Sequence, residues 1–120
     1  MVSVSSAVPK GADGNIDIAL WSDRLIQGHD RLKLEPIMET ASWLSGFGDG
    51  LLLQSLELAE MVAELRLDHS AVLAAMAYPG FRRSLFDEAN LQQRIGEQPA
   101  KLCVSVASLA ASSLLEVSDA

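Results

Sequence analysis

The sequence predicts an all-α fold, on three observations. Aromatic residues make up only 5% of the chain, and leucine and alanine, which lose little rotamer freedom in a helix, supply most of its apolar side chains. Residues 51–67 place leucines and alanines on one helical face and glutamates on the other. No β-hairpin turn signal and no internal repeat is present. A chain of 120 residues fits one domain, so we expect a single bundle of five to six helices.

The N-terminal part is predicted to contain an arm followed by a helix. Residues 1–14 end in proline, glycine and aspartate, a composition typical of a turn. Asn15 is then the expected N-cap of a first helix that runs to about Gln27. A second helix is expected from about Leu32 to Leu44.

Glycines at positions 46, 48 and 50 are expected to end the second helix. The third helix, Leu51 to Leu67, has the clearest amphipathic pattern in the chain. Asp68 is a suitable N-cap for a fourth helix that is apolar almost all round and is therefore expected to be buried. Pro79-Gly80 is predicted to end this helix.

Two further helices are expected. Asp87 is predicted to cap a short one closed by Gly96, and another begins near Gln98-Pro99. We therefore divide the chain into an arm (1–14), a helical domain (15–112) and a tail (113–120). We expect the domain to be incomplete at its C-terminus and to self-associate through an apolar face, which consists of Leu109, Leu114, Leu115 and Val117.

Composition excludes several classes of function. The hydrophobic fraction is 49% and the mean hydropathy +0.21, as in globular proteins. The net charge of −7 opposes nucleic acid, and the pair Arg82-Arg83 is too small for a basic patch. No apolar run approaches the roughly 20 residues of a membrane span, and the N-terminus lacks the pattern of a signal peptide. We expect a cytoplasmic protein that contacts neither nucleic acid nor membrane.

Candidate catalytic residues are few. Glu57, Glu60 and Glu64 share one face of the third helix, where a solvated surface is the simplest interpretation, so truncating Glu60 is expected to cost little stability. The glycines of residues 46–50 match no phosphate-binding spacing, and no lysine follows them. This segment is interpreted as a turn.

The two histidines and the single cysteine give no metal or nucleophile motif. His69 follows the capping Asp68 and is expected to point to solvent, and His29 is the only other histidine. Cys103 lies on the apolar side of the sixth helix and is interpreted as a small buried hydrophobic residue. We expect no cofactor.

A family resemblance is carried by three segments in order. Residues 56–79, LELAEMVAELRLDHSAVLAAMAYP, resemble the centre of the N-terminal hydrolase (HD-type) domain of long RelA/SpoT proteins, which reads A-E-I-L-A-D-L-R-M-D followed by T-L-I-A-A-L-L-H-D. Residues 85–96 and 101–109 are similar to the sequence that follows in that family. The resemblance covers nearly the whole chain and implies a truncated, HD-domain-like helical bundle.

The departures from the family pattern bear on activity. Active members hold a divalent metal, usually manganese, through a His before a Pro, a His-Asp pair and a later Asp. Gln54 stands at the first position, followed by Ser55, and Tyr78-Pro79 stands at the His-Asp pair. Arg82 and Arg83 replace an acidic pair, and the last Asp would lie beyond Ala120. The resemblance therefore implies a degenerate site with no metal, no catalytic residue and no assignable nucleotide-binding residue.

The resemblance implies a pseudo-hydrolase domain of a RelA-like (p)ppGpp synthetase, a GTP pyrophosphokinase of the stringent response. Such a parent protein transfers pyrophosphate from ATP to GTP or GDP, and this domain is expected to regulate the adjacent synthetase domain as its partner. An alternative is a free-standing helical protein-interaction module. An active metal-dependent phosphohydrolase is disfavoured, because glutamine and tyrosine are poor ligands for a hard ion and proline has no donor.

Overall fold

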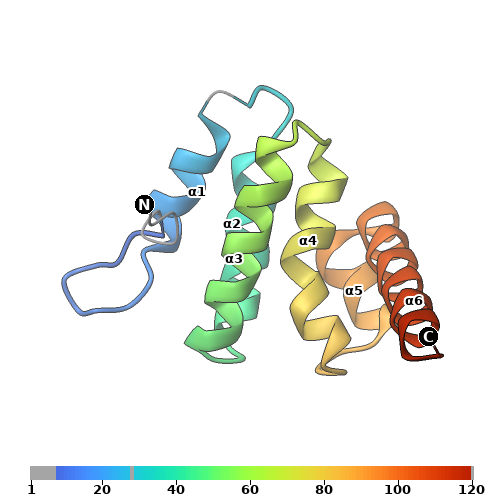
Figure 1. The fold of residues 1–120 in the computed structure, drawn as a ribbon. Coiled ribbons are helices and arrows are strands. Elements are labelled where there is room, and N and C mark those ends of the chain that lie inside the picture. The colour runs from blue at the N-terminus through green and yellow to red at the C-terminus, as the bar shows by residue number, and fades with distance from the viewer. Residues whose placement is uncertain (1–7, 28, 120) are drawn as a thin grey trace.

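The computed structural model describes residues 8–27 and 29–119, with side chains up to Leu109, and these residues form six α-helices (Figure 1). The helices are α1 (Ile18–Ile26), α2 (Leu34–Ser45), α3 (Asp49–Glu64), α4 (His69–Arg82), α5 (Glu88–Ile95) and α6 (Glu97–Asp119). The predicted all-α class is confirmed. One isolated antiparallel bridge, between Lys10 and Ile16, is the β pairing found in the described part of the chain.

Helix α4 lies at the centre of the bundle and packs against α2, α3, α5 and α6 (Figure 1). It is therefore buried on nearly every side, with Val72, Met76 and Ala77 fully inaccessible to solvent. In Figure 1, α1 lies at one end of the molecule and α6 at the other, while α2 lies behind α3 and also contacts α4 and α5. The expectation that α4 is buried because its sequence is apolar all round is confirmed.

The segment before α1 differs from the expected arm. Asp17, not Asn15, is the N-cap of α1, and its Oδ1 accepts a hydrogen bond from the backbone N–H of Leu20 at 3.0 Å. Asn15 instead closes a turn, because its backbone N–H donates to Asp13 Oδ1. Val8 is buried in the core at 7% exposure, so this residue packs against the bundle, whereas residues 12–15 are exposed. Residues 1–7 lie outside the described residues.

Helix α2 ends in the predicted glycine turn. The backbone N–H groups of Gly46, Phe47 and Gly48 donate to the last carbonyls of the helix. Gly48 then serves as the N-cap of α3 with φ of 107°, a conformation that residues with a Cβ rarely adopt. Helix α3 begins at Asp49, earlier than predicted, because Gly48 is its N-cap. It also ends earlier than predicted, because the backbone turns away at Arg66, whose φ is 61°.

The prediction that Pro79-Gly80 ends the fourth helix is wrong, because α4 continues to Arg82. Proline removes one hydrogen bond but leaves the backbone in helical geometry. Gly80 is needed for packing, since a Cβ here would lie 2.6 Å from the ring of the buried Phe86. The chain leaves the helix just after Arg82: Ser84 has φ of 61°, the N–H of Leu85 donates to Gly80 O, and that of Ser84 donates to Phe81 O. These two hydrogen bonds together form the Schellman motif.

The last two helices largely follow the prediction. Asp87 caps α5 through a capping box with Asn90, and Gly96 ends it with φ of 94°. Helix α6 continues without interruption to Asp119, so its backbone spans the predicted boundary at residue 112. The expected apolar face at Leu114, Leu115 and Val117 lies outside the described side chains. In the described part of the chain, no helix is long and apolar enough to cross a membrane.

Truncating the buried face of α4 should destabilise the fold. Leu73 is 4% exposed, so Leu73→Ala should lower the free energy of unfolding by about 2–5 kcal/mol, through lost burial and the cavity left behind. The matched control is Leu65→Ala, because Leu65 is 69% exposed and truncation there should change stability by less than about 0.5 kcal/mol. Urea melts measure the free energy of unfolding of both variants. Equal losses of stability would contradict the observed burial of Leu73 and exposure of Leu65.

Candidate functional site

The residues matched to the family's metal site lie in one surface groove between α3 and α4. This α3–α4 groove has a volume of about 540 Å³. Its lining consists of Gln54, Glu57, Leu58, Met61, Tyr78, Pro79, Arg82 and Arg83. The two helices form an antiparallel pair, which brings position 54 level with position 79. The helical phase turns Gln54 from one helix and Tyr78 from the other toward the same groove.

An arginine cation reaches the first of these positions. Arg83 Nη2 donates a hydrogen bond to Gln54 Oε1 at 2.7 Å. Arg82 and Arg83 are both exposed and line the groove together with one carboxylate, Glu57. Two guanidinium groups repel a divalent cation, and the amide of Gln54 is committed to one of them. The residues present do not fit the manganese ion that the family resemblance implies.

Among the described residues, no cluster of three or more His, Cys, Asp or Glu side chains could hold a metal ion. The two histidines lie elsewhere: His29 follows α1, and His69 begins α4. The expectation that His69 points to solvent is wrong. Its ring is half-buried, and Nδ1 accepts a hydrogen bond from the backbone N–H of Lys33 at 3.4 Å. Burial lowers the pKa of His69 below 6.5, the charge of Lys33 lowers it further, and Asp68 partly opposes this shift.

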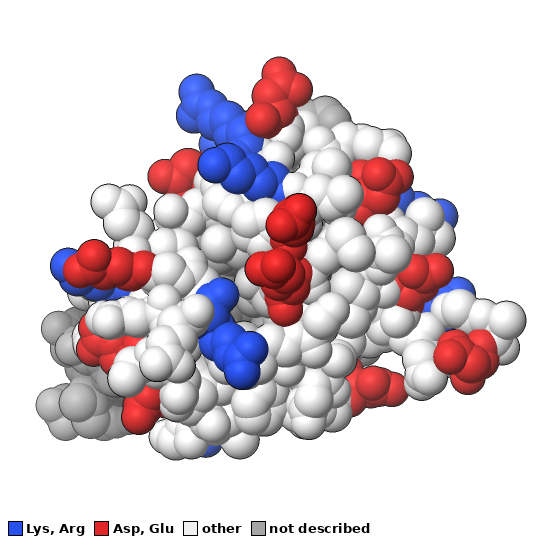
Figure 2. Space-filling view, turned by 180° about the vertical axis from the view of Figure 1, so that it is seen from behind, with Lys and Arg blue, Asp and Glu red and all other residues white. Residues whose placement is uncertain are grey.

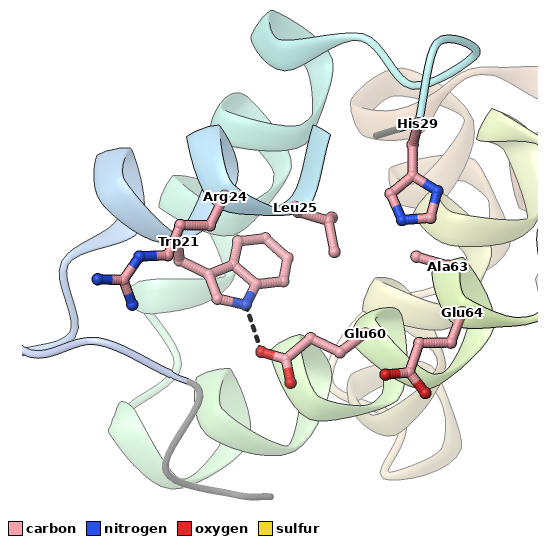
Figure 3. A pocket seen from close by; sticks show the side chains of 7 residues that line it. All are labelled: Trp21, Arg24, Leu25, His29, Glu60, Ala63 and Glu64. Carbon is pink, nitrogen blue, oxygen red and sulfur yellow. Dashed lines mark hydrogen bonds between the residues drawn. The ribbon is translucent and has the colours of Figure 1, made fainter. Parts of the chain in front are cut away.

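The expectation that the glutamates of α3 form a purely solvated face is wrong for Glu60. Its Oε2 accepts a hydrogen bond of 2.7 Å from Nε1 of Trp21, which is 2% exposed (Figure 3). A buried indole N–H needs an acceptor, and Glu60 of α3 supplies it to Trp21 of α1. Burial raises the pKa of Glu60, the Trp21 bond opposes this, and Glu57 and Glu64 add to the rise.

Around this bond lies a second hollow of about 300 Å³. Figure 3 shows Glu60 directed at the indole, with Glu64 and the His29 ring at the same opening, while the guanidinium of Arg24 points away. Sequence reasoning missed this pair. The available signal was the tryptophan itself, because it stands in an apolar helix and its N–H requires an acceptor when buried.

A third hollow is lined almost entirely by apolar side chains and lies between α3, α4 and α6. This apolar groove has a volume of about 480 Å³. It is lined by Leu58 and Val62 of α3; Ala71, Ala74, Ala75 and Tyr78 of α4; Leu102, Cys103 and Val106 of α6; and Leu67. Leu58 and Tyr78 also line the α3–α4 groove, so the two grooves adjoin.

Cys103 lies in the apolar groove as the predicted small buried hydrophobic residue. It is 1% exposed, and burial raises the pKa of its thiol to about 12. The thiolate that a nucleophile or a metal ligand requires is therefore scarce at neutral pH. The prediction that Cys103 is buried is confirmed.

The back of the molecule carries mixed charge. In Figure 2, acidic and basic side chains are interspersed over this face, and the described residues in view form no continuous basic stripe.

No family model, curated protein or solved structure matches this chain.

The Trp21–Glu60 bond should contribute measurably to stability. Glu60→Ala leaves the indole N–H of a 2%-exposed tryptophan without an acceptor, which should cost about 1–3 kcal/mol. Glu60→Gln keeps a carbonyl acceptor and removes the desolvated charge, so it should cost less than Glu60→Ala. Glu64→Ala, at an exposed position of the same face, is the control. Denaturant melts in which all three variants match the wild type would contradict this account.

The burial of His69 should make the fold sensitive to acid. Because the pKa of His69 is lower in the folded protein than its ordinary 6.5, the unfolded chain takes up this proton first as the pH falls. Stability should therefore decline on acidification from neutral pH through the lowered pKa, and level off below it. His69→Gln does not titrate, so the difference in unfolding free energy between wild type and variant should change as the pH falls from neutral through 6.5 and through the lowered pKa of the folded protein. A constant difference would show that His69 is not responsible.

Proposed function

We propose that this chain is the pseudo-hydrolase N-terminal domain of a RelA-like (p)ppGpp synthetase and that it regulates the adjacent synthetase domain. One observation carries the proposal. Gln54, Tyr78, Pro79, Arg82 and Arg83, the positions that the resemblance matches to the metal site and its acidic pair, line the same groove. The antiparallel pairing of α3 and α4 brings the two segments level, and the helical phase turns both toward this opening.

The chemistry of the groove supports a domain without hydrolase activity. In a hydrolase of this family, a bound divalent ion would lower the pKa of the attacking water and neutralise charge on a pyrophosphate. Gln54 and Tyr78 offer an amide and a phenol, and Pro79 offers no side-chain donor. Arg83 instead places a fixed positive charge at Gln54. The guanidinium group of Arg83 holds the side chain of Gln54, but unlike a bound metal ion it does not activate water.

A regulatory role follows from keeping the scaffold without the site. A domain biases a neighbour when its packing surface favours one of the neighbour's states over another. In the proposed parent protein, the neighbour transfers pyrophosphate from ATP to GTP or GDP. The residues that perform that transfer lie in the other domain, so no catalytic residue of this chain is assigned.

The second candidate is a free-standing helical protein-interaction module, and the apolar groove favours it. Large exposed apolar patches on a protein surface often mark sites where another protein binds. The coding sequence immediately after Ala120 separates the two proposals. A synthetase in the same reading frame supports the first, whereas a stop codon there supports the second.

The match between the α3–α4 groove and a metal site can be tested by reversal. Wild-type protein should show no specific manganese binding by electron paramagnetic resonance. A variant with the family's side chains at the matched positions should gain binding, because two imidazoles and added carboxylates then line one groove. The substitutions are Gln54→His, Tyr78→His, Pro79→Asp, Arg82→Glu and Arg83→Asp.

The matched control carries Arg82→Glu and Arg83→Asp alone, which adds the negative charge without the ligands. Circular dichroism establishes that each variant is folded. If a folded five-substitution variant bound manganese no better than this control, the correspondence with the family's metal site would be contradicted.

A further inference from the structure

The apolar groove between α3, α4 and α6 has the shape and chemistry of a helix-binding site. All ten of its lining residues are uncharged. Its volume of about 480 Å³ is roughly three times that of an engineered 150 Å³ cavity that holds one benzene. Three apolar side chains on one face of a helix, spaced i, i+4 and i+7, would fill it.

The two walls of this groove are complementary in size. Helix α4 contributes Ala71, Ala74 and Ala75, which share one helical face and form a shallow floor. Helix α6 contributes a ridge of larger side chains, Leu102, Val106 and Leu109, at spacings of four and three residues. These side chains are 38%, 43% and 68% exposed, so the ridge projects beyond the bundle. A floor of small residues therefore lies beside a ridge of large ones.

We propose that the apolar groove binds helix α6 of a second copy of this chain, so that two copies pair around a two-fold axis. A two-fold interface uses the same surface on both partners and must be complementary to itself. Here the ridge of each copy enters above the alanine floor of the other. The chain itself thus supplies a helix with the spacing that the groove accepts, and the proposal does not depend on the proposed function.

Charge limits where two copies can meet. Each copy carries a net charge of −7, so two copies repel one another at most of their surfaces. Neither the ridge nor the groove lining contains a carboxylate or a basic group. Pairing through this face buries no like charges and leaves the acidic side chains in water.

The number of residues in the proposed interface indicates how tightly the two copies should bind. Ten lining residues and Leu109 are fewer than the roughly 20–30 residues per partner of a standard interface. We therefore expect a dimer with a dissociation constant in the micromolar range, in reversible exchange with monomer.

Sedimentation velocity of the full chain, from micromolar to near-millimolar concentration, measures this equilibrium. Leu102→Asp with Val106→Asp should weaken dimerisation at least about tenfold, because each carboxylate would be buried without a partner. The control is Leu20→Asp with Leu85→Asp. These leucines match the ridge residues in exposure, at 38% and 43%, but lie outside the groove, so this variant should dimerise like the wild type.

A third variant covers the case in which the double substitution unfolds the protein. Leu109 is 68% exposed, and Leu109→Asp should leave the core intact while still weakening the dimer. Three results would overturn the proposal: a wild-type chain that stays monomeric throughout, equal weakening by the ridge and control variants, or folded ridge variants that dimerise normally. A monomer whose groove accepts only another protein's helix belongs to the first of these.

Discussion

Helix α4 has too few polar side chains to face water, and the rest of the bundle is arranged around this constraint. Its central turns, Val72 to Ala77, carry no charged or hydrogen-bonding side chain, and burying them requires neighbours on every side. Helices α2, α3, α5 and α6 supply these neighbours. The pairing with α3 also determines which side chains lie beside the exposed edge of α4, where Tyr78, Pro79 and Gln54 line one groove. The packing of an apolar helix thereby determines the composition of the candidate site.

Two polar contacts show how this scaffold accommodates charge. Glu60 accepts a hydrogen bond from the buried indole of Trp21 and joins α1 to α3, although burial raises the pKa of its carboxyl group. Arg83 donates to Gln54 and joins the end of α4 to the middle of α3. The first contact stabilises the packing of α1. The second places a guanidinium group of the chain at the position where the family resemblance implies a metal ion.

Much of the fold could be predicted from the sequence, and the errors have identifiable physical causes. The caps at Asp68 and Asp87, the glycine turn after α2 and the burial of Leu73 and Cys103 follow from local rules and are confirmed. The prediction that α4 ends at Pro79-Gly80 is wrong because the end of this helix depends on the ring of Phe86 and on the backbone at Ser84. The role of Glu60 depends on Trp21, 39 residues away in sequence. Single-helix patterns do not contain such long-range partners. The apolar groove was missed for the same reason, since its walls come from three helices.

The proposed function requires that the α3–α4 groove corresponds in position to a hydrolase site but lacks its chemistry. The most direct test is to incubate the purified chain with ppGpp and manganese and to measure released pyrophosphate. The account predicts release no faster than in a control without protein, because the groove offers one carboxylate, Glu57, beside two guanidinium groups, and the ion that would activate water needs several such ligands. Metal-dependent release above that control, abolished by Gln54→Ala or Tyr78→Phe, would contradict it.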